Sequence, residues 1–180
     1  MNRRKLLSYS EKKIIYFHKS GQINTENTLK LARERFHELK LNKVVIATSF
    51  GDSAVKALDF FESKDLVVIN SMYGYREEGK ESMNPHHRKK LEKAGVKIIN
   101  MTHVLSGIDR SIRQRYGGIT HTQLIAEVFK ILGEGFKVCA EIAVMAADCG
   151  AVSIDEEAMV IAGTCRGCDT AMVMVPAHSN

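Results

Sequence analysis

Short apolar runs alternate along this chain with amphipathic stretches, and this alternation limits the possible folds more than any other feature. The run at 43–48 is almost wholly apolar, as expected of a parallel strand that is buried on both faces. Apolar residues then recur at helical spacing until the next apolar run at 65–70. Strands that alternate with helices in this way predict β-α-β units and an α/β fold with a mostly parallel sheet.

The same patterns place the individual elements. Strands are expected at 13–18, 43–48, 65–70, 96–100, 157–162 and 170–175, and helices at 26–40, 53–61, 85–94, 107–116, 120–133 and 136–149. Thr25 and Thr120 are expected N-caps, and Pro85 opens a helix because proline is tolerated in a first turn. The apolar helix 136–149 has two open interpretations: burial against the sheet, or part of an interface in a homo-oligomer.

Length and composition indicate one domain over 1–180, in which 1–11 form a basic N-terminal extension. The 180 residues are 44% hydrophobic and 26% charged, which is ordinary for a globular protein. No apolar run approaches the roughly 20 residues of a membrane helix, and the N-terminus lacks a signal-peptide core. We therefore expect a cytoplasmic protein with no membrane partner.

The net charge of +5 raises the question of a nucleic-acid partner. Residues 1–19 carry the whole excess, and residues 20–180 hold 20 basic and 20 acidic side chains. A polyanion-binding face needs a basic stripe on the folded domain, and the best local candidate is Arg110, Arg113 and Arg115. Such a run is typical of a solvated helix face, so we expect no nucleic-acid partner.

Cys165 and Cys168 form a C-x-x-C motif. A structural zinc site needs four ligands, and neither a second C-x-x-C nor an H-x₃-H pair is present, so no metal is expected. A redox dithiol and a pair of ordinary reduced thiols are the two remaining interpretations. The second is favoured because a redox C-x-x-C usually opens a helix, whereas this one lies between two expected strands.

The segment after the strand at 43–48 has the composition of an anion-binding turn. Its members are Thr48, Ser49, Phe50, Gly51, Asp52 and Ser53. Gly51 permits a tight turn, the serines offer hydroxyls, and the free N–H groups of the following helix favour a phosphate. The alternative is that Asp52 or Ser53 only caps the helix.

Loops after the other strands carry further candidates, because ligands of parallel α/β sheets bind at the carboxyl ends of the strands. After 157–162 come Gly163, Thr164, Arg166 and Asp169. Arg166 can hold a phosphate or carboxylate with its forked donors, or it can pair with Asp169 in a hairpin-like turn.

Two more loops complete the candidate set. The members after 65–70 are Tyr73, Gly74 and Tyr75, and after 96–100 comes His103. The tyrosines can stack on a planar ring or pack on their own loop, and a lone histidine is more often structural than catalytic. The chain has no dinucleotide fingerprint, Walker loop or nucleophile elbow, and no catalytic residue emerges.

These loops together resemble the pyruvate kinase C-terminal-domain-like family, specifically its small stand-alone archaeal and bacterial members. The segments that carry the resemblance are 24–28, 48–54, 103–107, 145–148, 163–171 and 176–178. It implies a three-layer α/β/α sandwich whose mostly parallel sheet ends in an antiparallel strand. It also implies flavin mononucleotide (FMN) as the ligand. Phosphotransfer is not implied, because the barrel that holds the kinase active site is missing.

The function expected from the sequence is therefore the binding of a small phosphorylated ligand, FMN, at the carboxyl ends of the strands. One alternative is a non-catalytic sensor of a sugar phosphate or nucleotide. Another is an FMN-dependent oxidoreductase, for which no acid–base pair stands out. Cys165 and Cys168 depart from the residues expected of the family at these positions, so the C-x-x-C looks incidental to the ligand.

Overall fold

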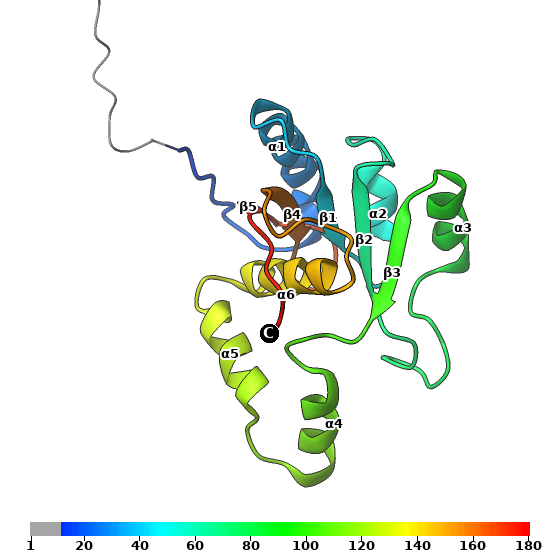
Figure 1. Cartoon of the computed structure of the whole chain (residues 1–180), viewed down its shortest axis with the longest axis vertical. Helices are drawn as coiled ribbons and strands as arrows, with labels where there is room; N and C mark the ends of the chain where they lie inside the picture. The colour runs from blue at the N-terminus through cyan, green and yellow to red at the C-terminus, as the bar shows by residue number, and fades with distance from the viewer. Residues whose placement is uncertain (1–11) are drawn as a thin grey trace, which may run out of the picture.

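Five strands form one sheet in the order β3-β2-β1-β4-β5 (Figure 1), as seen in a computed structural model that describes residues 12–180. The strands are β1 (Val44–Ala47), β2 (Leu66–Ser71), β3 (Lys97–Met101), β4 (Ala158–Ala162) and β5 (Thr170–Met174). The first four are parallel, and β5 runs antiparallel to β4. The expected α/β class and the antiparallel last strand are both confirmed.

Six α-helices and a short 3-10 turn surround the sheet within the described residues. They are η1 (Gln22–Asn24), α1 (Thr25–Glu38), α2 (Asp52–Ala57), α3 (Pro85–Lys93), α4 (Gly107–Tyr116), α5 (His121–Lys130) and α6 (Glu134–Asp148). Asn84 caps α3 through the amide of His86, and Thr120 caps α5 as expected. No helix in this part of the chain is long and apolar enough to span a bilayer.

Alternating strand residues point into two separate cores. On one face, Val44, Ile46 and Val68 pack with α1, α2 and α3. On the other, Val45 and Val67 pack with α6, whose Cys139, Ile142 and Met145 are fully or almost fully buried. Helices therefore cover both faces, which confirms the three-layer sandwich. The helix expected at 136–149 is mainly a helix that covers the sheet.

Two expectations about the N-terminal region are wrong. Residues 12–17 form no strand and pair with no strand of the sheet, and Ile14, Ile15 and Tyr16 are exposed. Thr25 is not an N-cap: Asn24 occupies that position, and the Thr25 hydroxyl donates to the Gln22 carbonyl. The predicted extension 1–11 lies outside the described residues.

The order of the strands creates a topological switch point. The chain moves outward from β1 through β2 to β3, and then crosses back through α4, α5 and α6 to enter β4 on the other side of β1. The turn that leaves β1 and the loop that leaves β4 lie next to each other at this point, at the carboxyl ends of the parallel strands. In open α/β sheets, the crevice between such loops is the usual ligand site.

Candidate functional site

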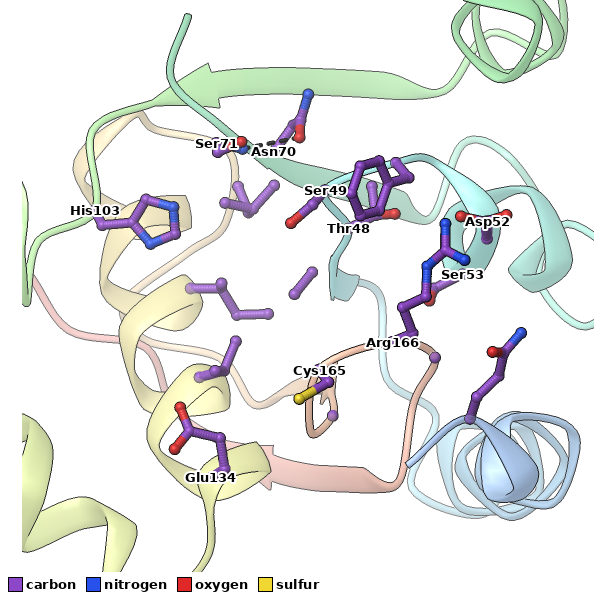
Figure 2. A pocket seen from close by; sticks show the side chains of 18 of the residues that line it. Thr48, Ser49, Asp52, Ser53, Asn70, Ser71, His103, Glu134, Cys165 and Arg166 are labelled. Atoms are coloured by element: carbon purple, nitrogen blue, oxygen red, sulfur yellow. Dashed lines mark hydrogen bonds between the residues drawn. The ribbon is translucent and has the colours of Figure 1, made fainter. Parts of the chain in front are cut away.

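A cavity of about 190 Å³ lies at this switch point, at the carboxyl ends of β1, β2 and β4 (Figure 2). Eight of the fourteen predicted site residues line it: Thr48, Ser49, Phe50, Asp52, Ser53, His103, Gly163 and Arg166. The other six do not: Gly51, Tyr73, Gly74, Tyr75, Thr164 and Asp169.

The turn after β1 is built around Gly51, whose φ of +96° is left-handed. Its amide donates to the Thr48 hydroxyl at 2.9 Å. A Cβ at this position would lie 2.6 Å from the Cβ of His87, so only glycine fits. Gly51 thus shapes the turn by packing against His87, without lining the cavity itself. Neither Asp52 nor Ser53 caps α2 through its side chain, so the capping alternative is wrong.

Two guanidinium groups lie against the ring of Phe50: that of Arg166, which lines the cavity, and that of Arg76, which does not. The Cζ atoms of Arg76 and Arg166 lie 4.7 and 4.9 Å from the ring centroid. Among residues 12–180, no carboxylate forms an ion pair with either arginine. The expected alternative, a pair between Arg166 and Asp169, is therefore wrong. Arg76 was not predicted, because no local pattern in its long loop indicates that it folds onto Phe50.

Asp169 does not line the cavity, and its carboxylate is engaged in hydrogen bonds that hold the β4–β5 loop. One carboxylate oxygen accepts from the Gly21 amide at 2.7 Å and from the Thr164 amide at 3.2 Å, and the other accepts from the Thr170 hydroxyl at 2.9 Å. Partial burial raises the pKa of Asp169, but these hydrogen bonds outweigh it and lower the pKa below its ordinary value. Thr164 and Asp169 thus join the β4–β5 loop to the segment before η1.

The tyrosines of the loop after β2 do not reach the cavity. Tyr73 is 58% exposed, and Tyr75 stacks on His103 with ring centroids 4.9 Å apart and an interplanar angle of 19°. The Arg110 guanidinium lies 4.3 Å from the same Tyr75 ring. Tyr75 therefore packs against the lining residue His103 and does not itself line the cavity.

His103 is held by a buried carboxylate. Its Nδ1 lies 3.6 Å from Oε2 of Glu141, and the Nζ of Lys137 lies 2.5 Å from the same oxygen. Burial raises the pKa of Glu141, but His103 and Lys137 outweigh it and lower the pKa to about 2. The other ring nitrogen of His103, Nε2, is buried and has no hydrogen-bond partner among the described residues.

The floor of the cavity is apolar and was missed by the sequence reasoning. Its residues come from β1, β2 and α6: Ala47, Ile69, Val138, Ile142 and Met145. They look like ordinary core residues in the sequence, so nothing marks them as a site. Further polar or small lining residues are Gln22, Asn70, Ser71, Glu134, Cys165 and Gly167. Asn70 and Ser71 end an apolar run at the carboxyl edge of the sheet, which is a signal that could have found them.

The two cysteines of the C-x-x-C motif lie in different environments and are both free thiols. Cys165 is exposed in the left-handed region at the mouth of the cavity, with φ of +62°. Cys168 is fully buried, and burial raises its pKa to about 11. Residues 12–180 contain no group of three or more His, Cys, Asp or Glu side chains arranged to hold a metal ion.

Comparisons with known proteins give weak similarities of fold. No known protein-family model matches the chain. A pyruvate kinase from Cryptosporidium parvum aligns with a TM-score of 0.47 and 14% identity, over 85% of this chain and 23% of the kinase. An NH3-dependent NAD synthetase from Campylobacter jejuni aligns with a TM-score of 0.41 and 14% identity, over 78% of this chain and 55% of the synthetase. The chain thus spans only part of both proteins, and these similarities carry no information on its function.

Proposed function

We propose that this protein binds a small phosphorylated molecule in the cavity at the switch point, and that the molecule is FMN. The observation that carries the proposal is the distribution of polar groups in the cavity. The Arg166 guanidinium lies on one side and His103 on the opposite side, as Figure 2 shows. Apolar side chains of β1, β2 and α6 line the space between them.

The arginine end suits the phosphate. Arg76 and Arg166 carry two positive charges that no carboxylate of the described residues neutralises, and both sit against Phe50 in the turn after β1. Guanidinium groups bind phosphate oxygens with paired, charge-assisted hydrogen bonds. The Ser49 hydroxyl, which faces the cavity from the same turn, supplies a further donor.

The histidine end suits the polar edge of a heterocycle. Glu141 fixes His103 through Nδ1, which leaves Nε2 to accept a hydrogen bond from a ligand N–H. Between the two ends, Ile69, Ile142 and Met145 offer an apolar surface for the face of a ring. The isoalloxazine ring of FMN has apolar faces and an N–H on its edge, so the residues present fit this group.

The size of the cavity favours a second candidate, a sensor of a sugar phosphate. Pockets for drug-sized ligands usually measure about 300–1,000 Å³. A cavity of about 190 Å³ encloses a sugar phosphate more completely than FMN, part of which would project to solvent. A sugar phosphate would bind the same arginines, but it has no aromatic ring to cover the apolar floor.

Absorbance and calorimetric titration separate these candidates. We expect FMN to bind with a change in its visible spectrum, and riboflavin, which has the same ring but no phosphate, to bind at least about 10-fold more weakly. Binding of ribose 5-phosphate without any binding of FMN would favour the sugar-phosphate sensor. If neither FMN nor a sugar phosphate binds, the proposal is wrong.

A further inference from the structure

Helices α4 and α5 expose an unusual amount of apolar surface. On α4, Ile108, Ile112 and Tyr116 are 78%, 45% and 76% exposed, and their spacing of four residues puts them on one stripe. None of the residues of α4 is buried. Figure 1 shows α4 projecting from the rest of the molecule, next to the turn that leads to α5.

Helix α5 carries a second exposed apolar stripe. Leu124 and Val128 are 53% and 60% exposed, and Ile131, just after the helix, is 81% exposed. The opposite side of α5 packs on α6 through the buried Ala126 and the ring of Phe129, which lies 6.1 Å from that of Phe136. The stripe Leu124, Val128 and Ile131 therefore points away from the protein's own core.

Two observations suit a partner at the α4–α5 surface, defined as Ile108, Ile112, Tyr116, Leu124, Val128 and Ile131. A helix of 10 residues such as α4 is marginal in water without tertiary packing. From these exposures the six side chains of the two stripes together present on the order of 700 Å² of apolar area, and exposed apolar surface of this extent marks an interaction site.

We propose that the α4–α5 surface binds the same surface of a second copy of this chain, which gives a two-fold symmetric dimer. The area supports a second copy, because each partner in a standard protein interface contributes about 800 Å². Two helices from each copy would form a four-helix arrangement that buries the apolar stripes.

The charges around the surface also favour a second copy. Helix α4 ends in Arg113 and Arg115, neither of which forms an ion pair within residues 12–180. Helix α5 carries Glu127, which pairs with Lys130 at 3.0 Å but keeps its side chain 56% exposed. A symmetric interface can set the arginines of one copy beside this partly exposed carboxylate of the other. An anionic membrane would attract α4 but repel this glutamate.

Sedimentation equilibrium tests the proposal on the full chain, from about 1 to about 100 μM. We expect the wild-type protein to have twice the monomer mass of 20.1 kDa. Ile112→Asp and Val128→Asp should each raise the dimer dissociation constant at least about 10-fold, because a charge is buried in an apolar contact. Both positions are exposed in the single chain, so folding, followed by circular dichroism, should be unaffected.

Ile154→Asp is the matched control, because Ile154 is 43% exposed but lies in the loop before β4, away from the α4–α5 surface. It should leave the dimer unchanged. A wild-type monomer throughout the concentration range would overturn the proposal. So would a dimer that both variants leave intact, or a monomer that binds vesicles of phosphatidylserine and phosphatidylcholine through these residues. None of these outcomes depends on whether FMN binds.

Discussion

Phe50 is an apolar residue that holds two positively charged side chains against its ring. Its ring gives the Arg76 and Arg166 guanidiniums a face on which to stack, and neither guanidinium forms an ion pair within residues 12–180. Under the proposed function, the ring would hold both groups in place for a phosphate, although it offers no polar atom of its own.

Removing either arginine should weaken phosphate binding. We expect Arg166→Ala and Arg76→Ala each to cost about 1–3 kcal/mol of FMN binding, or roughly 5- to 150-fold in affinity, through the loss of charge-assisted hydrogen bonds. Riboflavin, which has no phosphate, should bind equally well to wild type and variants. Isothermal titration calorimetry measures both ligands. Arg33→Ala, an exposed change on α1, serves as the control.

The lowered pKa of Glu141 predicts how the stability of the protein depends on pH. Its folded pKa of about 2 lies below the ordinary value of 4.5, so its stabilising contribution is complete above about pH 4.5 and is lost as the pH falls toward 2. Glu141→Gln removes the charge beside the nearly buried Lys137 and should lower the free energy of unfolding by about 3 kcal/mol at pH 7.

The difference between wild type and Glu141→Gln should shrink as the pH falls from 4.5 toward 2, which urea unfolding at several pH values measures. Glu157→Gln, an exposed change, should alter stability by less than about 0.5 kcal/mol at any pH. A constant difference across this range would show that Lys137 does not stabilise the ionised form of Glu141.

At the scale of elements, the β1–α2 turn depends on glycine for two separate reasons. Gly51 is left-handed, and a Cβ there would also collide with His87. We expect Gly51→Ala to destabilise the protein by at least about 2 kcal/mol, as backbone strain and overpacking add. Gly95→Ala is the matched control: its φ is +77° but its surroundings are open, so about 1 kcal/mol is expected. Equal losses in urea unfolding would rule out the contact with His87.

The elements that the sequence predicts well are those whose own pattern decides their structure. Buried strands such as β1 and β2 are continuous apolar runs, and α3 begins at a proline behind a capping residue. The run at 13–18 has the same local pattern as a strand, but it pairs with no strand of the sheet. Whether a segment pairs depends on the rest of the sheet, so a local sequence pattern does not predict it.

The residues of the candidate site also divide into those that a local pattern predicts and those that it does not. Residues in the turns that directly follow β1 and β4 were found, because the carboxyl ends of strands are where ligands of this fold class bind. The floor from α6, the position of Arg76 and the pair of His103 with Glu141 were missed. Each of these depends on segments that meet only after the chain has folded, so spacing along the sequence carries no signal for them.

At the scale of the whole molecule, the cavity joins parts of the chain that are distant in sequence. The turn at 48–53 leaves β1, the loop at 163–167 leaves β4, and α6 closes the side between them. A ligand in this cavity would contact both loops at once. Binding should therefore restrict both loops together, although they lie on opposite sides of the switch point.

Hydrogen exchange followed by mass spectrometry should detect this coupling. With FMN at about 100 times its dissociation constant, binding stabilises the folded state by about 2.7 kcal/mol, and amides in 48–53 and 163–167 should exchange more slowly. The segment 62–65 precedes β2 at the amino ends of the strands and contributes no residue to the cavity, so its exchange should be unaffected. In Arg166→Ala, the same free FMN concentration should protect both loops less. Protection of 163–167 alone would contradict a ligand that bridges β1 and β4, because the turn after β1 would then remain free to open.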